Sequence, residues 1–293
     1  MSAASATVSL VALVLACAPP QKLAKLGDCA LESGEVIRDC EIGYRTFGEL
    51  DEARSNAILL TPWAMGTSAD LARQIVAGRL LDRSGRYVIA VDGFANGVSS
   101  SPSNSARQKG RAFPRFSMRD VVESHYQLLT RVLGVSRLNA IVGTSAGGMQ
   151  VFHWVTAHPE FVDKAVAIAG SPRSSPADRL RWTTWADESI ADDFNRQARA
   201  IAGQDVSAPF GGSLERAAAA VRAKLLVIVP QRGEVVDPAP ALEFARLARA
   251  QVVVLDGRCG HRAIVCESDA VRRAVASFLG DERRSAARGP DSR

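Results

Sequence analysis

One serine lies in a glycine-rich segment that suits nucleophilic catalysis. Residues 140–152 read AIVGTSAGGMQVF, and Gly143 to Gly147 match the pattern G-x-S-x-G around Ser145. An apolar run precedes the pattern and an apparent helix follows it, which is the context that gives this short motif meaning. A serine on such a sharp turn takes a strained backbone conformation and needs small neighbours. The pattern therefore predicts a hydroxyl raised above a sheet and pointed at a ligand.

A serine hydroxyl needs a histidine base within hydrogen-bond reach, and the chain contains four histidines. His153 and His158 belong to the helix that begins at Ser145, and His125 falls inside an earlier helix. His261 follows the last predicted strand in the loop DGRCGHR, at the edge where a doubly wound sheet gathers its loops. We therefore predict that His261 is the base and that the other three are packed in the interior or lie at the surface without a catalytic role.

Apolar runs bounded by turn signals predict the strands that position these groups. Helices are expected at 117–133, 145–158, 239–249 and 268–279, and the first of them opens with the capping-box pattern Ser117-Met118-Arg119-Asp120. Continuous apolar strands that alternate with amphipathic helices indicate the α/β class, with a parallel sheet covered on both faces. The strands are expected near 36–46, 57–61, 87–91, 139–142, 165–169, 225–229 and 251–255.

The alternation of strand and helix stops between Gly170 and Lys224. Residues 171–223 are predicted to form a helical insertion over the edge of the sheet, within a single domain of residues 19–280. Trp182 and Trp185 in this insertion either line a substrate cleft or pack helices together. The polar segment 281–293 is expected to be disordered.

Composition excludes several classes of function. The 293 residues are 47% hydrophobic, enough for one large buried core, and the net charge of +5 is scattered rather than gathered in basic blocks. This distribution indicates a solvated surface and no nucleic-acid partner. No cluster of histidine, cysteine and aspartate has metal-ligand spacing, so neither a metal nor another cofactor is expected.

The first 18 residues carry no charge and contain a short apolar run, Val8 to Leu15. The run is too short for a permanent membrane span and resembles a cleaved export signal. Ala16 and Ala18 fit a cleavage site, whereas Val14-Leu15-Ala16-Cys17 resembles a lipoprotein box that would anchor Cys17 to lipid. The expectation is a periplasmic or membrane-anchored protein. Because a basic start is missing, the alternative is a cytoplasmic protein in which this segment is a buried N-terminal strand or follows from a misassigned start codon.

The remaining cysteines fall into two local pairs, Cys29 with Cys40 and Cys259 with Cys266. Two disulfides would suit an exported protein, and buried free thiols are the alternative. The second pair brackets His261.

Seven segments of the chain resemble the homoserine O-acetyltransferase-like group of α/β-hydrolase-fold proteins, over most of residues 35–270. The resemblance implies an α/β-hydrolase fold, with a mostly parallel doubly wound sheet and a short helical lid. It also implies a serine that takes an acyl group and passes it to a hydroxyl acceptor. The segments are IGYRTFGELD, NAILLTPWAMGTS, RYVIAVDGFANGVSSSPSN, FPRFSMRDVV, GTSAGGMQ, AIAGSPRSSP and CGHR.

Carried over to this chain, the resemblance implies that Ser145 is the nucleophile and His261 the base. The N–H of Ala146 would supply one oxyanion donor. The second would come from Pro62-Trp63-Ala64-Met65, which replaces the group's histidine-led segment, and the N–H of Met65 is the expected donor.

The third catalytic group stays open. Members of the group carry an aspartate a few residues beyond the strand that here reads LLVIVP, and Gly233 stands at that position. Glu234 is next door and has an extra methylene with which to reach back. Asp237 lies one turn later, although its place before Pro238 also suits a helix N-cap. Asp178, in the insertion, is a third candidate, and it would serve only if the acid has moved to the end of another strand.

These residues favour a serine acyl-transfer enzyme that acts on a small ester or thioester and passes the acyl group to a hydroxyl acceptor. Ester hydrolysis is the close alternative, because the insertion is short and export would separate the protein from cytosolic acyl-CoA. A non-catalytic binding protein that keeps the fold is a third hypothesis, motivated by Gly233.

Overall fold

The structure is a computed structural model that describes residues 18–78, 80–187 and 191–280. Most of the predicted export signal, including the proposed anchor Cys17, lies outside the described residues. The same holds for the predicted disordered tail, residues 281–293.

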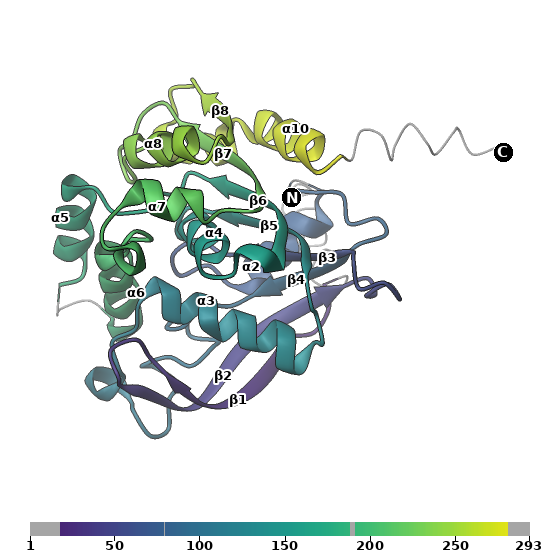
Figure 1. The fold of residues 1–293 in the computed structure, drawn as a ribbon. Coiled ribbons are helices and arrows are strands. Elements are labelled where there is room, and N and C mark those ends of the chain that lie inside the picture. The colour runs from purple at the N-terminus through teal and green to yellow at the C-terminus, as the bar shows by residue number, and fades with distance from the viewer. Residues whose placement is uncertain (1–17, 79, 188–190, 281–293) are drawn as a thin grey trace, which may run out of the picture.

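Eight strands form one sheet in the order β1-β2-β4-β3-β5-β6-β7-β8 (Figure 1). Strands β3 to β8 run parallel, and β1 and β2 are antiparallel at one edge. All seven predicted strands are present. The strands are β1 Lys22–Ala30, β2 Val36–Phe47, β3 Ala57–Thr61, β4 Tyr87–Val91, β5 Leu138–Thr144, β6 Val162–Ile168, β7 Lys224–Pro230 and β8 Gln251–Leu255.

Strand β1 was not predicted, because it contains no continuous apolar run. Its sequence KLAKLGDCA leaves most side chains exposed, and its pairing with β2 shifts register on either side of Gly27. The Cys29–Cys40 disulfide joins the two strands, as the cysteine spacing predicted. This edge hairpin is therefore held by a crosslink as well as by its ladder.

Helices cover both faces of the sheet, as predicted. In β3, Ala57 and Leu59 belong to the core beneath α3, α4, α7 and α8, whereas Ile58 and Leu60 belong to the core beneath α2 and α10. This alternation is the two-residue period of a strand buried on both faces. The helices are α2 Ser68–Val76, α3 Met118–Gln127, α4 Ala146–Ala157, α7 Leu214–Ala219, α8 Ala239–Leu247, α9 Ala263–Cys266 and α10 Ser268–Leu279.

The capping box predicted at the start of α3 is present. Ser117 Oγ accepts the N–H of Asp120 at 3.1 Å, and Asp120 Oδ2 accepts the N–H of Ser117 at 2.7 Å. The helix continues as a π-helical turn over Leu128–Val132, close to the predicted end.

The insertion is helical, as predicted, and its first two helices lie together on one side of the molecule (Figure 1). Helices α5 (Pro176–Trp185) and α6 (Asp192–Gly203) form this lid, and α7 returns to the sheet. Trp182 is buried against Trp185, with 5.0 Å between the ring centroids. The described residues include no helix with the length and hydrophobicity needed to cross a bilayer.

Candidate active site

Ser145 stands on the turn between β5 and α4 in a strained backbone conformation. Its φ of 56° and ψ of −118° lie in a region of backbone conformation that residues other than glycine rarely adopt. The N–H of Ser145 donates to Ile168 O on the neighbouring strand β6 at 2.8 Å, which holds the turn in place. The structure thus forms the sharp strand-to-helix turn that the motif predicted.

The glycines beside Ser145 are required because the backbone approaches them too closely for a side chain. A Cβ atom at Gly143 would lie less than 3.0 Å from both Gly147 O and Thr61 Oγ1. A Cβ atom at Gly147 would lie 2.8 Å from Pro62 O, and closer still to the Thr61 carbonyl. The turn can therefore pack against the end of β3 only if both positions are glycine.

The structure brings His261 to Ser145, as predicted. His261 Nε2 lies 3.0 Å from Ser145 Oγ, although the two residues are 116 positions apart. Burial lowers the pKa of His261 below its usual value of 6.5, and the negative charge of Asp178 acts in the opposite direction. A neutral imidazole at this distance is able to take the hydroxyl proton.

The other three histidines lie away from Ser145: His125 and His153 are buried, and His158 is partly buried. His125 Nε2 donates to Asp92 O at 3.1 Å, and the ring of His158 stacks on Tyr126. Burial lowers the pKa of both His125 and His153 to about 4, so both rings are neutral near pH 7.

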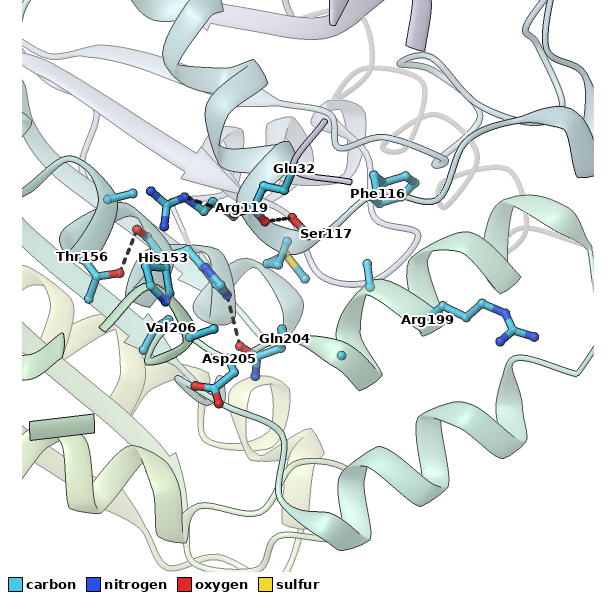
Figure 2. A pocket seen from close by; sticks show the side chains of 16 residues that line it. Glu32, Phe116, Ser117, Arg119, His153, Thr156, Arg199, Gln204, Asp205 and Val206 are labelled. Atoms are coloured by element: carbon cyan, nitrogen blue, oxygen red, sulfur yellow. Dashed lines mark hydrogen bonds and ion pairs between the residues drawn. The ribbon is translucent and has the colours of Figure 1, made fainter. Parts of the chain in front are cut away.

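His153 lies on a separate cavity of about 770 Å³. Figure 2 shows its ring facing Gln204, whose Oε1 lies 3.3 Å from Nε2, while Arg199 extends away from it. Arg119 on the same cavity is paired with Glu32. Ser145 does not line this cavity, so it is distinct from the site formed with His261.

The structure places Ala146, the predicted first oxyanion donor, at the start of α4. Its N–H therefore has no partner within the helix and lies at the positive end of the helix dipole. The prediction that the N–H of Met65 is the second oxyanion donor is wrong for this conformation. The N–H of Met65 donates instead to Gln197 Oε1 of α6 at 2.7 Å. In this conformation Met65 is not available to an oxyanion, and Ala64 lines the site instead.

The three candidate acids take different positions. Glu234 is exposed and lies against the backbone of Gly260. The carboxylate of Asp237 accepts the N–H of Ala239 at 2.9 Å, which supports the helix-capping interpretation. Asp178 is buried, with 2% of its surface exposed. None of the three accepts a hydrogen bond from His261 Nδ1 within the described part of the chain.

A pocket of about 390 Å³ opens onto Ser145 and His261. Sequence reasoning missed most of its walls, because they come from loops and helix faces that share no motif. Trp182 and Trp185 are not among the described lining residues, so the lid tryptophans pack rather than line the pocket. The described lining is Trp63, Ala64, Gln74, Leu80, Thr144, Ser145, Ile168, His261, Ile264, Val265, Ser268 and Val271.

The disulfide predicted between Cys259 and Cys266 forms, with 6.5 Å between the Cα atoms. It closes a short loop that contains His261 together with the pocket residues Ile264 and Val265. The described residues contain no group of three or more histidine, cysteine, aspartate or glutamate side chains placed to hold a metal ion.

Comparison with known proteins agrees with this geometry. Residues 59–223 match the α/β hydrolase fold family. The chain belongs to this family. Relatives that are homoserine O-acetyltransferases confirm the resemblance to that group.

Two curated relatives illustrate the range of chemistry in this α/β hydrolase group. The chain is 36% identical to an ethyl acetate hydrolase of Pseudomonas veronii over 181 residues, which cover 61% of this chain and 52% of the relative. It is 35% identical to a homoserine O-acetyltransferase of Citrifermentans bemidjiense over 164 residues, or 50% of this chain and 44% of the relative. The chain thus spans about half the length of these relatives.

A solved structure shares the fold over nearly the whole domain. The acetylester hydrolase of Corynebacterium glutamicum superposes with a TM-score of 0.82, at 23% sequence identity. The match covers 89% of this chain and 96% of that one.

Proposed function

We propose that this α/β hydrolase is a serine esterase that hydrolyses small uncharged esters through an acyl-enzyme on Ser145. The observation that carries the proposal is the 3.0 Å contact between Ser145 Oγ and His261 Nε2 at the floor of a mostly apolar pocket. Relatives and structural neighbours named as hydrolases of acetyl esters support the same reaction class.

The pocket lining favours a neutral substrate. Apart from His261, none of the described lining residues is ionisable, and most are apolar or carry only a hydroxyl or amide. A substrate group that carries charge would lose hydration here without gaining an ionic partner. Homoserine carries both an ammonium and a carboxylate, so the lining favours an ester and water over this acceptor.

The chemistry follows from the geometry in two steps. Ser145 Oγ bonds to the ester carbonyl carbon while its proton passes to His261 Nε2, and the carbonyl electron pair moves onto oxygen. The oxyanion is stabilised by the N–H of Ala146 and, in place of Met65, by the N–H of Ala64, which makes no hydrogen bond within the described residues. The leaving alkoxide takes the proton from His261 Nε2 and departs as the alcohol. Water then attacks the acyl carbonyl while His261 takes its proton, and the bond to Ser145 Oγ breaks as Oγ regains a proton and the acid is released.

Acyl transfer to a hydroxyl acceptor is the second candidate, supported by the homoserine O-acetyltransferase among the relatives. The first step is identical, and only the acceptor differs. A lid residue that excludes water from the acyl-enzyme would favour transfer over hydrolysis.

The purified full chain tests these proposals with three probes. We expect a fluorophosphonate to label Ser145, and p-nitrophenyl acetate to release p-nitrophenol without any added acceptor. Release of CoA from acetyl-CoA only when homoserine is present would favour the transferase. Absence of labelling and of turnover would support the non-catalytic binding protein.

Esterase activity should persist at pH values below the usual histidine pKa of 6.5. The reaction needs a neutral His261, and because burial lowers its pKa, the imidazole stays neutral as the pH falls to values below 6.5. Activity is then lost as the pH drops through that lowered pKa. The measurement is the dependence of kcat/KM on pH, and an acidic limb centred at or above pH 6.5 would contradict the expectation.

Opening the Cys259–Cys266 disulfide should lower turnover. The crosslink fixes the short loop that places His261 against Ser145, and a displacement of about 1 Å at a reacting group costs up to about 100-fold in rate. We expect Cys259→Ser/Cys266→Ser to lose about 10-fold or more in kcat. The matched control is Cys29→Ser/Cys40→Ser, which removes the disulfide of the distant β1–β2 edge. Equal losses in both variants would show general destabilisation instead.

We also propose that the protein is exported, as the N-terminal sequence predicted. The two disulfides support this proposal, because such bonds persist in oxidising compartments. Intact-mass analysis of protein recovered from a bacterial periplasm or membrane tests it. Cleavage near Ala18 is expected for a soluble form, and a lipid-modified Cys17 for an anchored form. Full-length protein confined to the cytoplasm would contradict export.

A further inference from the structure

A glutamine of the lid is hydrogen-bonded to the loop that supplies the second oxyanion donor. Gln197 lies on α6 and is half-buried. Its Oε1 accepts the N–H of Met65, in the loop after β3, at 2.7 Å. Its Nε2 donates to the carbonyl of Phe94, in the loop after β4, at 2.9 Å. One side-chain amide thus joins the lid to two loops that follow neighbouring strands of the sheet.

Residues 63–66 form a tight turn. The N–H of Gly66 donates to Trp63 O at 2.9 Å, so Ala64 and Met65 are the two central residues. Met65 has a φ of 60°, whereas the φ of Ala64 is negative. This combination is that of a type II turn, whose third residue is ordinarily glycine or asparagine. Methionine at this position costs conformational free energy, which a contact elsewhere must offset.

The alternative is a type I turn, in which the peptide group between the two central residues is rotated by about half a turn. Met65 would then have a negative φ and no strain. Its N–H would point away from Gln197, and the carbonyl of Ala64 would point toward it. Two acceptors, that carbonyl and Oε1 of Gln197, would then face each other without a proton between them.

Phe94 prevents Gln197 from adapting to that rotation. A free side-chain amide could exchange the places of Oε1 and Nε2 and so offer a donor to the carbonyl of Ala64. Here the exchange would place Oε1 against Phe94 O, which is also an acceptor. Both polar ends of the amide are matched only in the observed orientation, so Gln197 stabilises the type II form of the turn.

Helix α6 is itself held beside this contact. Arg196 Nε donates to Phe113 O at 3.0 Å. Asp193 is buried, and its Oδ1 accepts the N–H of Ser103 at 2.9 Å. These contacts keep the helix, and with it Gln197, against the loops that follow the strands.

We infer that Gln197 is a positioning residue for the oxyanion site. It holds the 63–66 turn in the form that engages the N–H of Met65 and leaves the N–H of Ala64 in place for the oxyanion, together with that of Ala146. This inference rests on the proposed function. Because rotation of the peptide group changes ψ of Ala64, a turn that alternated between the two forms would not hold this donor in one place. Gln197 acts through the turn and not on the reacting atoms.

Gln197→Met tests the inference, because it keeps the length of the side chain and removes both hydrogen bonds. With p-nitrophenyl acetate we expect kcat to fall by about 10-fold or more, with a much smaller change in KM. A trifluoromethyl ketone forms a tetrahedral oxyanion on a nucleophilic serine, so its inhibition constant should rise by a similar factor. A merely structural role would lower Tm without raising the inhibition constant.

Arg196→Met is the matched control. Arg196 is the neighbouring residue of α6, and it also donates two hydrogen bonds to backbone carbonyls, those of Arg111 and Phe113. Its replacement removes anchors of the same helix without touching the 63–66 turn. We expect a lower Tm, with kcat and the inhibition constant within a few-fold of wild type.

Met65→Gly should rescue the loss. Glycine takes a positive φ at no steric cost, so the turn keeps its type II form without help from Gln197. We expect Met65→Gly/Gln197→Met to recover most of the kcat and inhibitor affinity that Gln197→Met loses. The double variant also keeps the inference testable if Gln197→Met alone folds poorly.

The outcomes separate this inference from the proposed function. If the wild-type chain hydrolyses the ester and Gln197→Met leaves kcat and inhibitor binding unchanged, the inference alone is wrong. A rise of kcat in Gln197→Met would also overturn it, by showing that Gln197 withholds the N–H of Met65 from the oxyanion. Equal losses in Arg196→Met, or no recovery in the double variant, would show a structural contact only. Wild-type protein that is neither labelled nor active would overturn the proposed function, and the inference with it.

Discussion

Ser145→Ala is expected to lower ester hydrolysis by about 10⁵-fold or more and to abolish fluorophosphonate labelling. The variant removes the atom that bonds to the carbonyl carbon, and no other hydroxyl lies at hydrogen-bond distance from His261 Nε2 among the described residues. Because a hydrogen atom replaces the hydroxyl and the backbone is unchanged, the fold should be kept. The rate of p-nitrophenol release and intact mass after labelling measure the two effects.

Ser268→Ala is the matched control for this prediction. Ser268 lines the same pocket at the first turn of α10, and among the described residues no hydrogen bond joins it to His261. Its replacement should change kcat by no more than a few-fold. Retention of labelling in Ser145→Ala, or equal losses in both variants, would show that the nucleophile lies elsewhere.

Gly143→Ala is expected to destabilise the protein more than an ordinary surface substitution. The new Cβ atom would lie less than 3.0 Å from the Gly147 carbonyl and from Thr61 Oγ1, and backbone on both sides leaves little room to relax. Overpacking of this kind costs about 3 kcal/mol in free energy of unfolding, which corresponds to about 10 °C in Tm for a domain of this size. Displacement of the turn should also lower kcat. Thermal unfolding and turnover measure the two effects separately.

Gly203→Ala provides the contrasting glycine. It lies at the end of α6, its φ is not in the left-handed region, and no atom approaches within 4 Å of the added Cβ. This substitution should leave Tm unchanged or raise it slightly, because alanine loses less backbone entropy in a helix. Equal destabilisation by both glycine substitutions would contradict the steric explanation of the serine turn.

The contrast between Met65 and Ala146 shows how much of the site can be predicted from local sequence. The N–H of Ala146 is fixed as a donor by its place at the start of a helix, which the motif itself predicts. The N–H of Met65 depends on which side chain approaches it, and Gln197 arrives from the lid, 132 residues away. No spacing in the sequence signals that approach.

Asp178 illustrates a second limit. It lies three residues after Ser175, in the same pattern that begins α3 at Ser117 and Asp120. In α3 the aspartate caps its own helix, whereas the Asp178 carboxylate accepts the N–H of Asp237, in the loop after β7. That contact depends on how α5 packs on the loop, so the local pattern does not indicate it.

Sequence patterns predict the alternation of strands and helices, the serine turn, the choice of His261 and the pairing of the cysteines. These features depend on residue periodicity, on steric requirements of neighbouring residues and on short loops. The packing of distant segments decides which partners the candidate carboxylates find, which N–H stays free and which side chains line the pocket. Each of these depends on the approach of segments far apart in the chain, where a displacement of one or two ångströms makes or breaks a hydrogen bond.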